Sequence, residues 1–304
     1  MSSTVESVAR PSPGTRTARS VAWWQRRSTR QRALKAVATL IAALFAVAVL
    51  FPVVWMISTS LKTTDQTAAI PIIWVPIPPQ WHNYIDALTA EDFGLFFRNT
   101  AIITVGSLIG TVLSSSLAAF GFARLRAPGR NFLFILVLST LMLPAPVTIV
   151  PRFILFTKLH WINTFLPLIV PAWFGGGAFN VFLLRQFFMT VPREMDEAAR
   201  IDGAGFFQIY WRIMLPMSLP ALGIVCIFHF IYAWNDFFEP LIFLNNNNVW
   251  TVAIGLAGFT AAYGGTAWNL LMAASLVAML PCVLLFFVAQ RYFVQGVVIT
   301  GVKG

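Results

Sequence analysis

The sequence predicts an all-α polytopic membrane protein with six transmembrane helices. Of its 304 residues, 58% are hydrophobic and only 11% are charged, whereas soluble domains carry about 25% charged residues. Six uncharged runs are each long enough to cross a bilayer, because a spanning helix needs roughly 20 apolar residues. The runs lie between Lys35 and Lys62, Arg98 and Arg124, Arg130 and Arg152, Lys158 and Arg185, Arg212 and Asp236, and Glu239 and Arg291. Together they predict a transmembrane domain over residues 36–290.

The basic residues predict the orientation of these spans. With the N-terminus inside, the inner segments hold 17 Lys and Arg residues and the outer segments hold 4. Because cytoplasmic loops carry an excess of basic residues, we expect residues 1–35 to lie in the cytoplasm. These residues are expected to form a disordered basic tail. Residues 291–304 are expected to form a cytoplasmic C-terminal tail. The chain is then a multi-pass protein of the cell membrane, and its net charge of +10 reflects topology and predicts no nucleic-acid partner.

Prolines and asparagines mark the connections. The first outer loop, residues 63–97, holds four prolines between Pro71 and Pro79, which favour an extended chain and exclude a regular helix. The third run contains Pro144 and Pro146, which predict a bend near its outer half. In the last run, the asparagines at 245–248 and the glycines after them predict a loop, so that the spanning part is about residues 268–290.

A charged stretch between the fourth and fifth runs predicts a short helix outside the membrane. Glu194, Asp196 and Glu197 lie at its start, where the helix dipole favours carboxylates. Asp196 and Arg200 are four residues apart and are expected to pair on one face. Gly203 follows the last helical residue, at the position where a left-handed cap favours glycine.

The next piece of the same loop is amphipathic. Phe206, Ile209, Tyr210 and Ile213 follow the spacing that places side chains on one face of a helix. The elbow before this piece consists of small residues, which allow the backbone of a partner to approach closely. The whole cytoplasmic loop spans about residues 186–216.

This loop resembles the EAA loop of permease subunits of ATP-binding cassette (ABC) importers. The family pattern is EAA, three residues, G, nine residues and I-x-L-P, and here it reads Glu197-Ala-Ala, Gly203 and Ile213-Met-Leu-Pro. The resemblance implies the type I ABC importer permease fold, with the loop docked in a cleft of a separate cytoplasmic ATPase. It implies an ATPase-coupling role for Glu197, Ala198, Ala199, Asp202, Gly203, Ala204, Ile213, Leu215 and Pro216.

Four further stretches resemble the sugar-importing, MalG-like members of this family. They are Pro-Pro-x-Trp-x-Asn-Tyr at 78–84, the basic turn at 122–130, Trp-Asn-Asp-Phe at 234–237 and the C-terminal residues 290–304. The likeness covers residues 36–304 and implies import of a di- or oligosaccharide or a related sugar. The implied partners are a second, MalF-like permease subunit, an ATPase dimer that binds ATP and Mg²⁺, and an extracytoplasmic sugar-binding protein. No cofactor is expected on this chain itself.

Five residues in or near the spans are candidates for the substrate path or a gate: Asn180, Trp234, Asn235, Asp236 and Glu239. Polar groups at this depth are costly unless they meet water or a partner. Asn180 either holds helices together or faces the path. The stretch from Trp234 to Glu239 combines aromatic faces with hydrogen-bond acceptors, which suit a carbohydrate. It equally suits an interfacial belt with helix-capping carboxylates.

The main alternative function is that of a secondary transporter driven by an ion gradient. Such proteins usually carry ion-coupling carboxylates within their spans, but the first four runs and the last spanning part contain no Asp or Glu. The sequence also shows no nucleophile–base set, no metal-ligand spacing and no phosphate-binding loop, and its three histidines are scattered. An enzyme is therefore not predicted. The sequence leaves open whether the substrate is a sugar or glycerol phosphate.

Overall fold

The computed structural model describes residues 21–261 and 266–301. Within these ranges the chain forms helices joined by turns and irregular segments, and no strand is found among them. The predicted all-α fold is therefore confirmed. The chain divides into two compact units, Met1–Trp55 and Met56–Gly304.

Helix α1, Val21–Ser60, supplies the described part of the first unit and enters the second with its last residues. The prediction of a disordered tail up to residue 35 is wrong from Val21 onward. The reason is composition, because residues 21–51 contain no Gly or Pro and are rich in Ala, Leu, Arg and Gln, which are strong helix formers. The part Leu34–Ser60 is apolar enough to span a membrane.

Four stretches are long and apolar enough to cross a membrane, and two bent helix pairs raise the number to six if each pair counts as one span. The four stretches are Leu34–Ser60, Phe93–Arg124, Leu166–Thr190 and Trp268–Gln290. The pairs are Arg130–Met142 with Pro146–Lys158, bent by 101°, and Phe206–Met217 with Leu219–Asn235, bent by 77°. Counted in this way, the six predicted spans are present, two of them in bent form.

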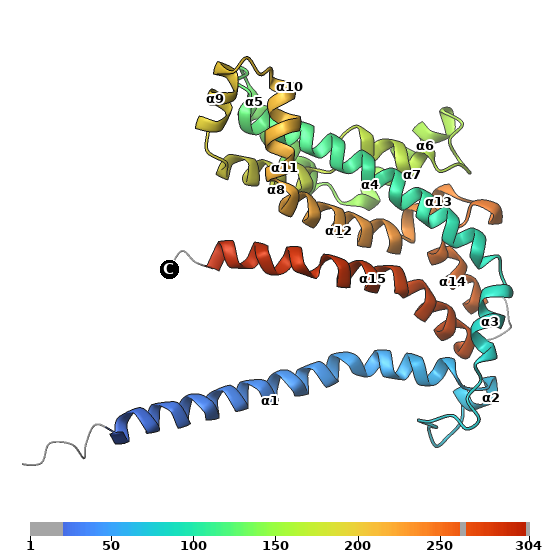
Figure 1. Cartoon of the computed structure of the whole chain (residues 1–304). Helices are drawn as coiled ribbons and strands as arrows, with labels where there is room; N and C mark the ends of the chain where they lie inside the picture. Colours follow the sequence, from blue (N-terminus) through green and yellow to red (C-terminus); the bar gives the residue numbers. More distant parts are fainter. Residues whose placement is uncertain (1–20, 262–265, 302–304) are drawn as a thin grey trace, which may run out of the picture. The chain divides into compact units, whose positions relative to one another are not determined.

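Figure 1 shows the order of the helices along the chain. In the second unit they are α2 (Thr64–Thr67), α3 (His82–Thr89), α4 (Phe93–Arg124), α5 (Arg130–Ser139), η1 (Thr140–Met142), α6 (Ala145–Lys158), α7 (Leu166–Trp173), α8 (Ala178–Thr190), α9 (Glu194–Ile201), α10 (Phe206–Ile209), η2 (Tyr210–Met214), α11 (Leu215–Met217), α12 (Leu219–Asn235), α13 (Phe238–Phe243), η3 (Asn247–Val249), α14 (Val252–Ala261) and α15 (Trp268–Gly301).

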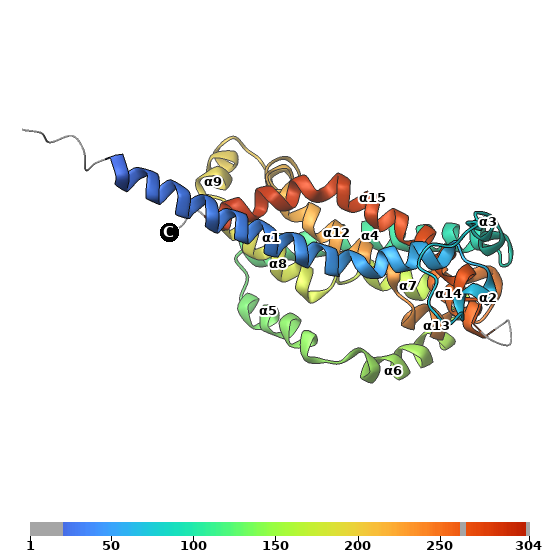
Figure 2. The same cartoon turned by 90° about the horizontal axis from the view of Figure 1, so that it is seen from below.

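The bend in the third span occurs where the prolines predict it. Residues 143 and 144 separate η1 from α6, and the two arms point in different directions (Figure 2). Two other connections contain more helix than predicted. The first outer loop is irregular around its prolines but forms α3 from His82, because no proline follows Pro79 there. The glycine-containing segment after the asparagines forms α14, and α15 continues as helix through the predicted tail to Gly301.

Helix α4 lies at the centre of the second unit, where α7, α8 and α12 pack along it (Figure 1). Gly106 and Gly110 allow the close approach of α7, in the small-xxx-small spacing of membrane helix pairs. A Cβ atom on Gly110 would lie 2.4 Å from the ring of Trp173. Nε1 of Trp173 donates a hydrogen bond to the carbonyl oxygen of Gly106 at 3.1 Å. The indole therefore locks α7 onto α4.

One face of α4 is both polar and buried. Thr100, Thr104, Ser107, Thr111 and Ser115 recur every three or four residues, and each is at most 3% exposed. The spacing places them on one side of the helix. Three residues of this hydroxyl stripe, Thr100, Ser107 and Thr111, line a cavity in the bundle.

Candidate functional site: a coupling loop and a polar cavity

Helix α9 carries the first half of the EAA-like loop and ends in a Schellman motif. Gly203 has a φ of +82°, which is the left-handed conformation predicted for it. Its N–H donates to the carbonyl of Arg200 at 3.0 Å, and the N–H of Ala204 donates to the carbonyl of Ala199 at 2.8 Å. These two hydrogen bonds define this type of helix cap. The elbow after α9 therefore has a fixed geometry.

A buried ion pair fastens α9 to the transmembrane bundle. Nη1 of Arg124, the last residue of α4, lies 3.3 Å from Oδ2 of Asp196, and the two side chains are only 4% and 12% exposed. Nη2 of Arg124 donates to the carbonyl oxygens of Phe188 and Val191, where α8 ends, at 2.7 Å each. A single guanidinium thus joins α4, α8 and α9.

The predicted pairing of Asp196 with Arg200 is wrong. Asp196 faces the bundle, where Arg124 takes its carboxylate. The guanidinium of Arg200 instead lies over the ring of Phe206, with its central carbon 4.5 Å from the ring centroid. This cation–π contact connects α9 to the helix that follows the elbow.

The nine residues assigned to ATPase coupling divide into two groups. Five are exposed: Glu197, Ala198, Asp202, Gly203 and Pro216. The other four, Ala199, Ala204, Ile213 and Leu215, are partly buried, and all of these except Ile213 pack on the hydrophobic core. Beside α9 lies a groove of about 240 Å³ lined by Arg124, Arg126, Arg193, Asp196, Glu197, Arg200 and Phe206. The loop therefore has an anchored inner side and a free outer side.

The helix after the elbow departs from the predicted amphipathic pattern. Residues 210–214 form a π-helical turn, whose wider winding changes the face that later residues occupy. Ile213, within this turn, is only partly buried, and Phe206, before the turn, is 52% exposed. The buried residues are Ile209, Tyr210 and Met214.

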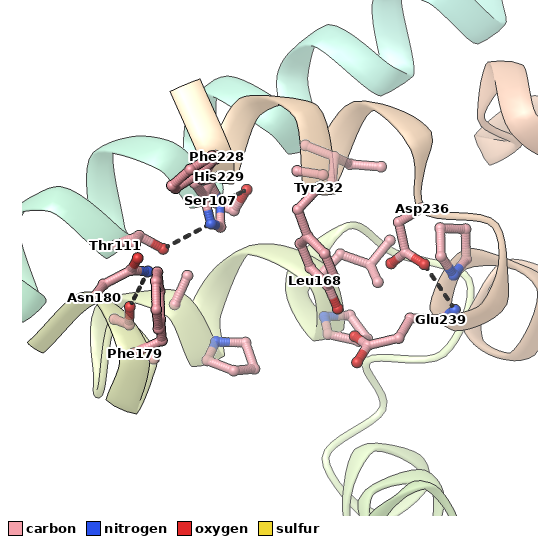
Figure 3. Close-up of a pocket in the computed structure, with 18 of the residues that line it drawn as sticks. Ser107, Thr111, Leu168, Phe179, Asn180, Phe228, His229, Tyr232, Asp236 and Glu239 are labelled. Carbon is pink, nitrogen blue, oxygen red and sulfur yellow. Dashed lines mark hydrogen bonds between the residues drawn. The ribbon is translucent and has the colours of Figure 1, made fainter. Parts of the chain in front are cut away.

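A cavity of about 550 Å³ lies among α4, α6, α7, α8, α12 and α13 (Figure 3). Three of the five residues predicted for the path or a gate line this one cavity, namely Asn180, Asp236 and Glu239. The sequence did not show that they lie together. The other polar and charged lining residues are Thr100, Ser107, Thr111, Arg152, His229, Tyr232 and Thr251.

Two hydroxyl groups of α4 hold His229 at one end of the cavity (Figure 3). Its Nε2 lies 2.9 Å from Oγ of Ser107, and its Nδ1 lies 3.3 Å from Oγ1 of Thr111. Nearby, Nδ2 of Asn180 donates to the carbonyl of Gly176 at 2.7 Å. This end of the cavity presents hydroxyl, imidazole and amide groups.

Asp236 and Glu239 lie toward the other end of the cavity (Figure 3). Oδ1 of Asp236 accepts hydrogen bonds from the backbone N–H groups of Phe238 at 3.2 Å and Glu239 at 3.4 Å. The capping role considered for this carboxylate is confirmed, although the residue also lines the cavity. Asp236 follows the last residue of its span, and burial together with the Glu239 carboxylate raises the pKa of its carboxyl to about 6.

An ion pair closes this acidic end. Nη1 and Nη2 of Arg152 in α6 donate to Oε1 and Oε2 of Glu239 at 2.5 and 2.9 Å. The guanidinium carbon also lies 5.8 Å from the ring centroid of Phe156 and 5.6 Å from that of Phe243. The pair therefore ties the second arm of the bent third span to α13.

The structure does not bring Trp234 and Asn235 to this cavity. They line a separate cavity of about 510 Å³ among α12, α14 and α15. Nε1 of Trp234 donates to the carbonyl of Ala278 in α15 at 3.0 Å, and its ring stacks on that of Phe230 at 5.4 Å. Nδ2 of Asn235 donates to the carbonyl of Ile231 at 2.8 Å. Trp234 thus packs α12 against α15.

Sequence reasoning missed two components of the first cavity. His229 was set aside because the histidines show no ligand spacing, yet the hydroxyls that hold it recur on one face of α4. That periodicity was a usable signal. Arg152 was counted only as a basic residue of an outer segment, because nothing in the sequence connects it to Glu239, 87 positions later.

Comparison with known proteins places the chain in a family. Residues 106–299 match the family described as the inner membrane component of binding-protein-dependent transport systems. The chain is 33% identical to the probable ABC transporter permease protein YurM of Bacillus subtilis, with 86% of each chain covered. It is 35% identical to the arabinooligosaccharides transport system permease protein AraQ of Halalkalibacterium halodurans, covering 86% of this chain and 94% of the relative.

A third relative and a solved structure complete the comparison. The sn-glycerol-3-phosphate transport system permease protein UgpE of Yersinia enterocolitica is 34% identical, over 82% of this chain and 91% of the relative. A chain of a bacterial ABC transporter for the acidic polysaccharide alginate shares the fold with a TM-score of 0.75 at 22% identity, covering 87% of this chain and 98% of that chain. The protein therefore belongs to the family of inner-membrane permease components of binding-protein-dependent ABC transport systems.

Proposed function

We propose that this permease imports a di- or oligosaccharide, driven by ATP hydrolysis on a separate ATPase dimer. The observation that carries the proposal is the coupling loop. Helix α9 is capped at Gly203, tied to the bundle by Arg124, and exposes Glu197 and Ala198 at its surface. A rigid projection with small and acidic residues suits insertion into a cleft of a partner. The sugar class is supported by the relative named for arabinooligosaccharides.

The contacts of Arg124 supply a route from the loop to the transmembrane bundle. When the ATPase dimer closes, α9 moves with it, and α4 and α8 follow because the same guanidinium holds all three. Both α4 and α8 line the cavity of about 550 Å³. Their movement therefore changes the side of the membrane to which the cavity opens. Glu197 is the charged contact of the loop with the ATPase.

The proposed assembly contains a second, MalF-like permease, the ATPase dimer and an extracytoplasmic sugar-binding protein. The family description, which names binding-protein-dependent transport, supports the binding protein. The excess of basic residues in alternate loops supports a cytoplasmic position for both termini and for α9. ATP and Mg²⁺ are bound by the ATPase, and this chain binds no cofactor.

Uptake into proteoliposomes tests the proposal. The full complex is reconstituted with its binding protein, and uptake of a panel of labelled neutral trisaccharides, including arabinotriose, is measured with and without ATP and Mg²⁺ on the ATPase side. We expect uptake of at least one sugar only with hydrolysable ATP. Uptake driven by a proton or sodium gradient without ATP would overturn the proposal and restore the ion-driven alternative.

A further inference from the structure

The charged side chains that line the cavity of about 550 Å³ carry more negative than positive charge. Apart from the imidazole of His229, its charged lining residues are Arg152, Asp236 and Glu239. One guanidinium thus faces two carboxylates, and the set carries a net charge of −1 when all three are ionised. The balance bears on the substrate, because relatives of similar identity are named for a sugar and for glycerol phosphate.

Arg152 is already paired with a carboxylate. Its two terminal nitrogens bind both oxygens of Glu239, which is the bidentate geometry of arginine–carboxylate pairs. The rings of Phe156 and Phe243 lie within 6 Å of the guanidinium carbon. Three of its five N–H groups remain outside this pair, but the Glu239 carboxylate offsets the charge of the guanidinium. An incoming phosphate or carboxylate would therefore gain little from this cation and would meet the negative charge of Glu239 beside it.

Asp236 contributes a negative charge, and within residues 21–261 and 266–301 no cation is hydrogen-bonded to its carboxylate. The hydrogen bonds to its carboxylate come from two backbone N–H groups. Arg152 acts on Asp236 only through space. Among the lining residues, Asp236 is thus the group that an anionic substrate would meet as a like charge.

The neutral groups suit a polyol. His229 has hydroxyl partners on both ring nitrogens, and neither Ser107 nor Thr111 is an acid that would favour its charged form. Asn180 and Tyr232 add an amide and a phenol, and Phe179 and Phe228 add aromatic faces. Sugar hydroxyls need such donors and acceptors, and the apolar faces of sugar rings pack on aromatic rings. A cavity of this size lies within the range of small-molecule sites, about 300–1,000 Å³.

Building on the proposed function, we infer that this cavity binds uncharged sugars and excludes anionic ones, with Asp236 as the specificity-determining residue. The inference separates this chain from its relatives named for glycerol phosphate and from the structurally similar alginate transporter. At an effective dielectric constant of about 20, like charges about 5 Å apart repel strongly enough to weaken binding by at least tenfold. Neutral sugars avoid this penalty.

Equilibrium binding to the complete membrane complex, without ATP and without the binding protein, tests the inference. The probes are a panel of neutral trisaccharides, sn-glycerol-3-phosphate and an alginate trisaccharide, measured at physiological salt. We expect at least one neutral sugar to bind at least tenfold more tightly than either anion. Since the whole complex is used, charges on the partner permease are included in the measurement.

Three variants assign the effect to this chain. Asp236→Asn keeps an oxygen that can cap α13 but removes the charge, so it should improve anion binding at least fivefold. His229→Ala should weaken neutral-sugar binding at least fivefold. Asp65→Asn, an equal charge change on exposed α2, should alter neither. Thermal unfolding of each complex distinguishes lost binding from lost folding.

Several outcomes would overturn the inference. They are binding of an anion as tight as that of the best neutral sugar, absence of binding by every neutral sugar, and an Asp236→Asn complex that excludes anions as strongly as the wild type. Failure of the proposed function has a different signature. If uptake is independent of ATP while the charge preference persists in this assay, the coupling scheme is wrong and the specificity assignment stands.

Discussion

Arg124 and Asp196 form a buried ion pair that connects the end of α4 to the EAA-like helix α9, with Nη1 and Oδ2 3.3 Å apart. The same arginine also takes the carbonyls of Phe188 and Val191, where α8 ends. Buried ion pairs contribute little net stability compared with apolar replacements, whereas loss of one partner leaves an uncompensated buried charge. We therefore propose that this ion pair transmits the movement of the loop to the transmembrane bundle.

Removing one member of this pair should be far more harmful than replacing both. Arg124→Met alone leaves the Asp196 carboxylate and the two α8 carbonyls without their guanidinium, and Asp196→Leu leaves a buried cation. Each single change should cost about 3–5 kcal/mol of stability. Arg124→Met with Asp196→Leu should recover much of that loss, as measured by thermal unfolding of the complex in detergent.

The double variant also separates folding from coupling. If the ion pair transmits movement from the loop, the double variant should retain basal ATPase activity. Its stimulation by substrate-loaded binding protein should fall at least fivefold. Normal stimulation in the double variant would show that α9 moves the bundle through other contacts. Arg126→Met, at an exposed position two residues after Arg124, is the matched control. Arg126 lines the groove beside α9 but does not belong to the ion pair, so this variant should behave as the wild type.

The effect of a substitution at Gly203 should depend on whether the new residue tolerates the left-handed backbone conformation, and not on the size of its side chain. Its φ is +82°, and no atom of the described part of the chain lies within 4 Å of the position that a Cβ atom would occupy. Asn tolerates the left-handed region, whereas a β-branched residue does not. Gly203→Asn should therefore keep most ATP-driven uptake and Gly203→Val should lose most of it, although the Val side chain has one heavy atom fewer. Equal loss in the two variants would mean that contact with the partner, and not the cap, requires glycine here.

The close packing of α7 on α4 predicts that a larger side chain destabilises the protein at one glycine of α4 and not at another. A Cβ on Gly110 would lie 2.4 Å from Trp173, whereas a Cβ on Gly121 would meet none of the described residues within 4 Å. Gly110→Ala should lower the thermal midpoint of the complex, and Trp173→Leu should restore part of it in that background. Gly121→Ala should leave the midpoint unchanged or raise it slightly. A similar loss in both glycine variants would contradict the packing described for α7.

Anion exclusion by the cavity should weaken in acid. Burial and Glu239 raise the pKa of Asp236 to about 6, so its carboxylate is charged above that pH and becomes neutral as the pH falls through it. Arg152, Tyr232 and Glu239 face the same carboxyl. Binding of an alginate trisaccharide, whose carboxylates stay ionised, should therefore rise between pH 7.5 and 5. The rise should disappear in Asp236→Asn; if it persists there, protonation of His229 is its cause.

The elements that follow from local rules were predictable from the sequence. The spans, the proline bend of the third span and the left-handed cap at Gly203 each depend on neighbouring residues alone. The partner of Asp196 was mispredicted because the helical spacing to Arg200 offered a local pair, while the actual partner, Arg124, lies 72 positions earlier. The π-helical turn at 210–214 was missed because the amphipathic pattern assumes regular winding.

The cavity was only partly predictable, because its residues come from segments that are far apart in the sequence. Polar residues in apolar runs marked Asn180, Asp236 and Glu239 individually, but their common location depends on how α8, α12 and α13 pack. Trp234, in the same short stretch as Asp236, faces α15 because helix α12 ends between the two residues. The direction of a side chain at a helix end is set by tertiary packing, which the sequence pattern does not report.

The most direct test of the account is ATP hydrolysis stimulated by substrate-loaded binding protein, compared between Ala198→Trp and Ala127→Trp. Both residues are exposed, and Ala127 lies in the turn between α4 and α5, outside the EAA-like loop. The account predicts that Trp at 198 abolishes stimulation without impairing membrane insertion, because it blocks the close fit of α9 to the ATPase, whereas Trp at 127 leaves stimulation within about twofold. Wild-type stimulation and uptake with Trp at 198 would contradict the assignment of α9 as the coupling element.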